Sequence, residues 1–231
     1  MRQDFLKGMR HGIPVMLGYL SVSFGFGINA VAAGLSVLQA VGISLTNLTS
    51  AGQVAGVTII AAGGSLIEMA AAQFIINIRY SLMGFSLSGK LSSSFTTGHR
   101  LITSFGITDE NFAIASVQPE PLTPSYLYGL ELVGLLGWVL GTFLGAFAGN
   151  ILPMRVTAAM GLMLYGMFIA IIIPPAKKDH RVLFVILLAA GLSVLIRYGF
   201  SFISAGTSVI VCAVLASVIG AVLFGHKEAA T

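Results

Sequence analysis

Hydroxyl and amide side chains crowd the stretch "ISLTNLTSAGQ" (43–53), which lies inside a long apolar segment. Serine and threonine hydroxyls bond back to helix carbonyls and weaken the helical ladder. We therefore predict that the segment is irregular near Thr49–Gly52. A helix interrupted inside a membrane exposes amide and carbonyl groups that bind the carboxylate and ammonium of an amino acid. The alternative is a continuous helix with a polar face. The candidate binding residues in this stretch are Asn47, Thr49, Ser50, Gly52 and Gln53.

A second set of polar residues lies within "AAQFIINIRYSLMG" (71–84). Gln73, Asn77 and Ser81 recur every four residues, so they share one face of a helix. Lipid offers no hydrogen bonds, so such a face either joins helices or lines a substrate path. We include Gln73 and Asn77 among the candidate binding residues.

Arg79 lies off that face, about 200° further round the helix. Its side chain either extends to lipid headgroups or pairs with an acid or a substrate carboxylate. The candidate acids in the central loop are Asp109 and Glu110, within "GITDENFA" (106–113). Thr108 precedes them and is expected to cap a short helix whose first turn suits their charge. We assign Arg79 to the binding set, and Asp109 and Glu110 to coupling or gating.

The composition is that of a membrane protein. Of 231 residues, 56% are hydrophobic and 9% are charged, whereas soluble domains carry about 25% charged residues. No Asp, Glu, Lys or Arg occurs between Arg10 and Glu68. The four histidines and the single Cys212 show no metal-ligand spacing, and nucleotide-binding and hydrolase motifs are absent from the sequence. We expect no cofactor, no metal, no nucleic acid partner and no enzymatic activity.

The fold class expected is an all-α integral membrane protein, a polytopic helical bundle of six to seven transmembrane segments with a broken or re-entrant helix. Segment length identifies the spans. They are 13–34, 37–62, 125–150, 156–174, 182–203 and 205–225, with a more polar seventh at 66–87. A single transporter domain, 1–231, then consists of a first helical group (13–87), a central polar loop (88–123) and a second helical group (124–225).

Lysine and arginine are typical of cytoplasmic loops. The lysine and arginine residues predict a cytoplasmic location for four stretches: the N-terminal residues, 88–123, 174–181 and 225–228. If all seven segments cross the membrane, these four stretches cannot all lie on the cytoplasmic side. Either 66–87 or a neighbouring segment therefore enters without crossing, or the N-terminus faces outward. The spacing of small residues in 24–36 also resembles that in 140–152, a weak internal repeat of the kind found in secondary transporters. Small residues are equally common in any membrane bundle.

Several stretches occur in an order that resembles the AzlC family, the large subunit of branched-chain amino acid exporters. They are "GIPVMLGYLSVSFGFGINAVAAGLS", Gln53 followed by "IIAAGGSL", then "NIRYSLMGFSL" and "FGITDENFA". The resemblance extends through "VLGTFLGAFAG" (139–149) and the apolar C-terminal segments, so it covers nearly the whole chain. No single stretch is as specific as a nucleotide or zinc signature, and the specificity of the resemblance comes from their order and spacing together.

Position by position, the family's Ala-Gly-x-x-Gln element falls on residues 49–53, where Thr49 and Ser50 replace Ala-Gly. Its Asn-x-Arg-His element falls on residues 77–80. Tyr80 stands there in place of the histidine, which removes the natural proton carrier near neutral pH from that position. The Thr-Asp-Glu element is intact at residues 108–110.

The resemblance implies a multi-pass exporter of branched-chain or other hydrophobic amino acids in the cytoplasmic (inner) membrane. It also implies proton coupling and a small AzlD-like membrane subunit as partner in a two-component permease. A passive channel or a non-transporting membrane scaffold is the alternative, and export against a gradient separates it from the first reading. A membrane-embedded enzyme using Asp109 and Glu110 as acid and base is disfavoured, because no nucleophile or metal set accompanies them.

Overall fold

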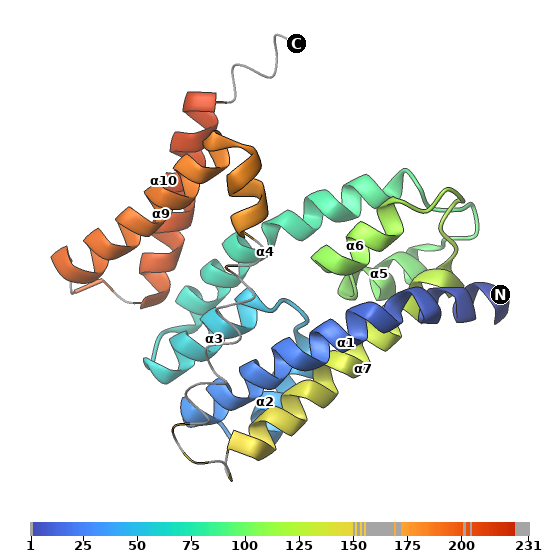
Figure 1. Ribbon diagram of the computed structural model, residues 1–231, viewed down its shortest axis with the longest axis horizontal. Coiled ribbons are helices and arrows are strands. Elements are labelled where there is room, and N and C mark those ends of the chain that lie inside the picture. Colours follow the sequence, from blue (N-terminus) through green and yellow to red (C-terminus); the bar gives the residue numbers. More distant parts are fainter. Residues whose placement is uncertain are drawn as a thin grey trace. The chain divides into compact units, whose positions relative to one another are not determined.

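The computed structural model describes residues 2–149, 151, 153, 155, 169, 172–200, 202–203 and 205–224. These residues are mostly helical and form no β-strand, so the predicted all-helical fold is confirmed (Figure 1). The helices are α1 (Arg2–Ala32), α2 (Val37–Thr46), α3 (Ala51–Ala61), α4 (Leu66–Ser88), α5 (Thr97–Phe105), α6 (Asp109–Ser116), α7 (Pro124–Gly149), α9 (His180–Gly199) and α10 (Ala205–Phe224).

Among the described residues, four helices are long and apolar enough to cross a membrane: Arg2–Ala32, Pro124–Gly149, His180–Gly199 and Thr207–Phe224. Each matches a predicted span, but the prediction that the first begins at residue 13 was wrong. α1 begins at Arg2 because its first turns pack against the start of α7. The predicted span 156–174 lies mostly outside the described residues.

The chain forms two compact units, one of Met1–Gln53 with Asn77–Leu164 and one of Val54–Ile76 with Tyr165–Thr231. The boundaries fall within α3 and within α4, so each of these helices contributes to both units. The first unit contains α1, α2, α5, α6 and α7, and the second contains α9 and α10. All the candidate site residues except Gln73 belong to the first unit.

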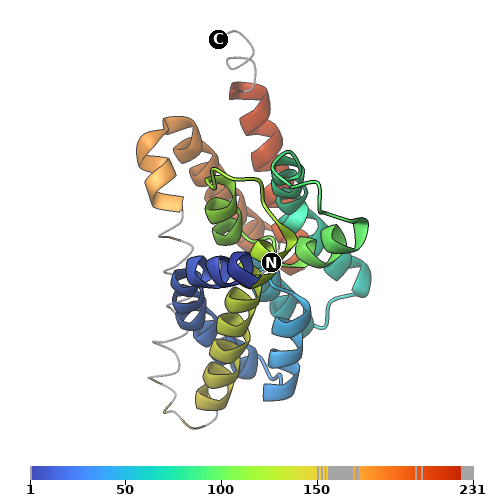
Figure 2. The ribbon, with the colours of Figure 1, turned by 90° about the vertical axis from the view of Figure 1, so that its right-hand side faces the viewer.

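α1 and α7 lie side by side through the first unit (Figure 2). A Cβ atom added to Gly8 would lie 2.1 Å from the Tyr126 carbonyl oxygen, and one added to Gly145 would lie 2.0 Å from the Phe24 carbonyl oxygen. Contacts therefore follow the same order along both helices, which shows that the helices are parallel. Small residues allow membrane helices to approach this closely, and the gain is in dispersion contacts between the backbones.

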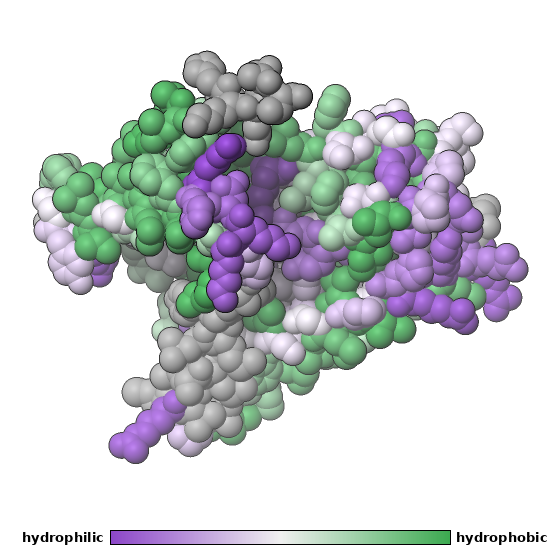
Figure 3. Space-filling view, turned by 45° about the horizontal axis from the view of Figure 1, so that its top comes forward, coloured by the Kyte–Doolittle hydropathy of each residue, from purple (hydrophilic) through white to green (hydrophobic). Residues whose placement is uncertain are grey.

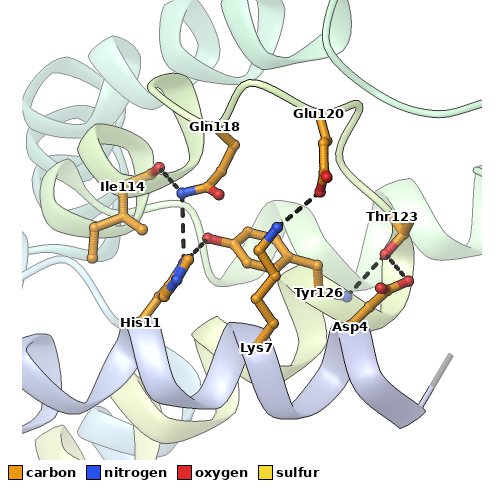
Figure 4. A network of polar contacts seen from close by, with 8 residues as sticks. All are labelled: Asp4, Lys7, His11, Ile114, Gln118, Glu120, Thr123 and Tyr126. Carbon is orange, nitrogen blue, oxygen red and sulfur yellow. Dashed lines mark hydrogen bonds and ion pairs between the residues drawn. The ribbon is translucent and has the colours of Figure 1, made fainter.

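The start of α1 is tied to the loop that precedes α7 (Figure 4). Lys7 Nζ lies 2.8 Å from Glu120 Oε2, and the Thr123 hydroxyl donates to Asp4 Oδ2 at 3.1 Å. Hydrophilic side chains gather on the right of Figure 3, the side on which Figure 1 places the N-terminus. The N-terminus and the end of the 88–123 loop therefore lie on the same side of the first unit, as predicted from the lysine and arginine residues in both stretches.

This placement limits the number of crossings. The chain must cross an even number of times between the start of α1 and the start of α7. With α1 crossing once, the segments 37–62 and 66–87 make one net crossing between them, so one of the two enters without crossing. The first of these consists of α2, with 10 residues, and α3, with 11 residues. A helix needs about 20 residues to span a bilayer, so neither α2 nor α3 spans it alone.

Three contacts organise the second unit. The Glu68 N–H donates to Ser65 Oγ at 3.1 Å, which satisfies one of the free amides at the start of α4. The Thr207 N–H in the first turn of α10 donates to Glu68 Oε1 at 3.1 Å. α9 and α10 form an antiparallel pair, in which Gly220 lets a Val185 methyl group approach to 2.7 Å of the position that a Cβ would occupy.

Candidate functional site

The predicted interruption of segment 37–62 is present. α2 ends at Thr46, and a short link precedes α3. Asn47 leaves the helix in an extended conformation, and Ser50 has φ +49°. The Thr46 hydroxyl donates back to the Gly42 carbonyl at 2.8 Å, the kind of bond that weakens a helical ladder. The sequence thus breaks the helix through local side-chain competition.

The link packs into the middle of the first unit. Leu48 is buried in a cluster with Val15 and Tyr19 of α1 and Trp138 of α7. Tyr19 and Trp138 lie close to the middle of their helices, and their rings meet edge to face with centroids 5.1 Å apart. The break therefore lies at mid-height of two helices of membrane-spanning length.

A ladder of side-chain hydrogen bonds holds the two sides of the break against α7. Gln53 Nε2 donates to Ser44 Oγ at 3.0 Å, and Ser44 Oγ lies 2.7 Å from Thr142 Oγ1. Thr142 Oγ1 donates to the Trp138 carbonyl at 3.0 Å. All three side chains of the ladder are almost completely buried. Neither Ser44 nor Thr142 was predicted as a site residue, although a hydroxyl in an apolar span has to find a partner.

Three buried polar atoms at or beside the break have no hydrogen-bond partner within the described part of the chain: Ser50 Oγ, Gln53 Oε1 and Trp138 Nε1. Each unpaired buried group of this kind costs about 1–3 kcal/mol, so a ligand or an ordered water that pairs with it is stabilising. They offer one acceptor, one donor and one hydroxyl that can do either. The ends of α2 and α3 add carbonyls and amides that lack intrahelical partners. The arrangement can bind a small molecule that carries both a positive and a negative group.

Arg79 pairs with Asp109, one of the two acids that the sequence suggested. Nη1 lies 2.9 Å from Oδ1 and 2.7 Å from Oδ2. Nη2 donates to the Tyr80 hydroxyl at 3.3 Å, and Cζ lies 4.9 Å from the centroid of the Tyr80 ring. The two charged side chains are 43% and 36% exposed, so solvent screens the pair and it contributes at most about 1 kcal/mol to stability. The pair therefore orients α4 on α6 without locking the two together.

Glu110 is bound by a tyrosine that was not predicted as a site residue. The Tyr19 hydroxyl lies 2.6 Å from both Glu110 Oε2 and Thr108 Oγ1. Its single proton can serve only one of them, and the carboxylate is the stronger acceptor. Thr108 Oγ1 also accepts from the Asn111 N–H at 3.3 Å, which confirms the predicted cap of α6. Tyr19 therefore joins the acids of α6 to the Leu48 cluster. The sequence signal that could have identified Tyr19 is its position inside an apolar span, where a tyrosine hydroxyl needs a hydrogen-bond partner.

The remaining predicted residues divide between the units. Gly52 is buried at the start of α3, and Asn77 is half-buried in α4. Gln73 lies in the second unit, where its Nε2 is 3.9 Å from Met69 Sδ. Ser81 is exposed, so the predicted polar stripe of α4 is covered only over its first part. Within the first unit, α1 and α6 connect the break with the acids and the arginine, whereas Gln73 belongs to the other unit.

The chain matches the AzlC protein family over residues 14–152. It is 29% identical over 183 residues to "Inner membrane protein YgaZ" of Escherichia coli (strain K12), which covers 76% of this chain and 75% of that protein. It is 32% identical over 178 residues to an uncharacterized membrane protein of Archaeoglobus fulgidus, covering 76% and 78%. A membrane protein of Helicobacter pylori strain 26695 is 24% identical over 188 residues, covering 77% and 81%. No solved structure matches the chain.

The family match runs from α1 to just beyond α7, so it includes the break, the polar ladder and the acids of α6. The relatives are membrane proteins, in agreement with the apolar composition and the four helices of membrane-spanning length. The predicted integral membrane fold is thereby confirmed. This chain belongs to the AzlC family of membrane proteins.

Proposed function

We propose that this protein is a secondary transporter that exports branched-chain or other hydrophobic amino acids across the cytoplasmic (inner) membrane. In this proposal it is the large subunit of a two-component permease with a small AzlD-like membrane subunit, and protons drive export. The observation that carries the proposal is the break between α2 and α3 at mid-height of α1 and α7, beside three buried polar atoms without partners.

The chemistry of the break fits an amino acid. The first amides of α3 and the Trp138 indole N–H are donors for a carboxylate, and the helix dipole favours an anion there. The last carbonyls of α2 and Gln53 Oε1 are acceptors for an ammonium group. Leu48, Tyr19 and Trp138 supply apolar surface for an aliphatic side chain. A zwitterion with an apolar side chain would satisfy all of these groups together.

The acids of α6 suit a gating or coupling role. The ion pair between Arg79 and Asp109 is partly exposed, so it can open and re-form at a cost of at most about 1 kcal/mol. Glu110 contacts Tyr19, which packs directly on Leu48 of the break. A change at α6 is therefore transmitted to the link through one buried side chain. Such a small difference between two states is what a ligand can reverse.

The test is efflux of radiolabelled valine from loaded cells that express the chain with and without its small partner subunit, at matched membrane abundance. Gln53→Leu keeps the volume of the side chain and removes both of its polar groups, so we expect it to abolish efflux. Gln3→Leu is the matched control, because Gln3 is exposed at the start of α1. We expect this control to export at the wild-type rate.

The outcomes separate the alternatives. Efflux that continues when the valine concentration is higher outside the cells than inside supports a coupled exporter, and efflux that stops at equal concentrations identifies a passive channel. No efflux above that of empty cells, with any hydrophobic amino acid, leaves a non-transporting scaffold. Equal efflux from Gln53→Leu and Gln3→Leu would remove the break from the substrate path.

A further inference from the structure

A carboxylic acid that belongs neither to the break nor to the acids of α6 is buried within α7. Glu131 lies about two turns after the start of α7 and is only 9% exposed. Its side chain packs on the backbone of Gly106, where an added Cβ would lie 2.5 Å from Oε2. Within the described residues the structure gives this carboxyl no hydrogen bond and no ion pair. An ionisable group inside a membrane span is costly and usually functional.

The carboxyl borders a cavity of about 250 Å³. Its lining residues are Phe5, Leu48, Ile102, Phe105, Gly106, Tyr128, Glu131, Leu132 and Leu135. The walls are almost entirely apolar, and no lysine or arginine is among them. α1 and the helix break contribute groups that do not titrate, Phe5 and Leu48. The titratable neighbours are Tyr128 of α7 and, behind it, His99 of α5, whose ring meets that of Tyr128 with centroids 6.0 Å apart.

An unpaired carboxylate in such surroundings is penalised by several kcal/mol, so the group binds a proton. A substrate ammonium is the other candidate ligand, but it needs about three acceptors. Among the described residues that line the cavity, only Glu131 and Tyr128 offer side-chain oxygens. The Gly106 carbonyl already accepts from Asn111 Nδ2 at 2.9 Å. A proton needs a single acceptor, and the cavity therefore suits a proton better than an amine.

Two contacts connect this carboxyl to the proposed transport site. Gly106 ends α5, and two residues later Thr108 caps α6, the helix that carries the acids. Leu48 lines the cavity and also packs in the link between α2 and α3. When Glu131 gains or loses its charge, its interactions with water and with the turn at Gly106 change. Gly106 connects this change to the start of α6, and Leu48 connects it to the break.

We propose that Glu131 is the group that takes up and releases the coupled proton. The inference rests on the proposed transport function. The proton comes from water on one side of the membrane, binds the carboxylate to give the neutral acid, and leaves to water on the other side.

The test uses the full chain with its partner subunit in proteoliposomes, with radiolabelled valine as the probe. Glu131→Gln keeps the shape of the neutral acid. We expect it to retain valine counterflow without a pH gradient to within about twofold of wild type, and to lose accumulation driven by a pH gradient, because exchange needs no net proton movement. Glu120→Gln is the control, since Glu120 is exposed and paired with Lys7. It should leave both activities unchanged.

A second measurement does not depend on transport. Infrared spectroscopy of the purified wild-type protein should show a buried protonated carboxyl band that titrates with pH and is missing in Glu131→Gln. If the wild type moves no valine, the proposed function fails, and this band still decides whether Glu131 binds a proton. Wild-type accumulation by Glu131→Gln, or a band that persists in it, would overturn the assignment. Loss of counterflow with a raised KM for valine would instead make Glu131 a substrate ligand.

Discussion

Replacing Gly145 by alanine should destabilise the first unit more than any ordinary surface change in α7. A Cβ at this position would lie 2.0 Å from the Phe24 carbonyl oxygen and 2.7 Å from the carbonyl carbon. An ordinary contact begins at 3.4 Å, so the shortfall is 1.4 Å. Both opposing atoms are backbone, and no side-chain rotation can relieve the overlap. α1 and α7 have to separate.

We expect Gly145→Ala to lower the free energy of unfolding by about 3 kcal/mol, the upper end of the usual range for overpacked cores. Separation also loosens neighbouring contacts, because a Cβ on Gly141 would lie 2.1 Å from Ser23 Oγ on the same face. Gly18→Ala is the matched control in α1, since nothing lies within 4 Å of its Cβ position. Alanine is the better helix former by about 0.5–1 kcal/mol, so the control should be neutral or stabilising.

The assay is equilibrium unfolding of the purified chain in mixed micelles, followed by the fluorescence of Trp138, the only tryptophan in the sequence. Trp138 packs between α1 and the helix break, so its emission reports on the interface under test. We expect the free energies of unfolding of the two variants to differ by roughly 3–4 kcal/mol. Equal free energies of unfolding for Gly145→Ala and Gly18→Ala would refute the close parallel packing of α1 and α7.

Three further substitutions probe the candidate site. Arg79→Lys should lower valine efflux about tenfold or more while changing the free energy of unfolding by less than about 1 kcal/mol, because the exposed pair is weak but its planar geometry is lost; wild-type efflux at matched abundance would reduce Arg79 to an interfacial anchor. Tyr19→Phe should lower the free energy of unfolding by about 1–3 kcal/mol in the same assay, since Glu110 loses a hydrogen-bond donor. An unchanged midpoint would mean that this hydrogen bond does not stabilise the protein. Ser50→Gly should raise the free energy of unfolding by about 1 kcal/mol by relieving the positive φ, yet lower efflux; a loss of stability would show that the Ser50 hydroxyl supports the link.

The sequence by itself determined the features that depend on neighbouring residues. The break between α2 and α3 follows from hydroxyl and amide side chains that compete for the helix backbone near Thr49 and Ser50. The cap at Thr108 follows from the preference of a helix N-terminus for a hydroxyl before acids. The apolar spans follow from composition and length. Each of these needs only a window of one or two helical turns, so no tertiary contact is required to predict them.

Only the tertiary structure decided which distant residues meet. The contact of Tyr19 with Glu110 and that of Ser44 with Thr142 each join residues about ninety to a hundred positions apart, and no periodicity within a helix encodes them. α1 begins at Arg2 because it has α7 to pack against, which hydropathy cannot show. Glu131 was not among the residues predicted from the sequence. Its burial follows from the packing of α5 on α7, because the glycine at position 106 leaves room for a carboxyl and for nothing that could neutralise it.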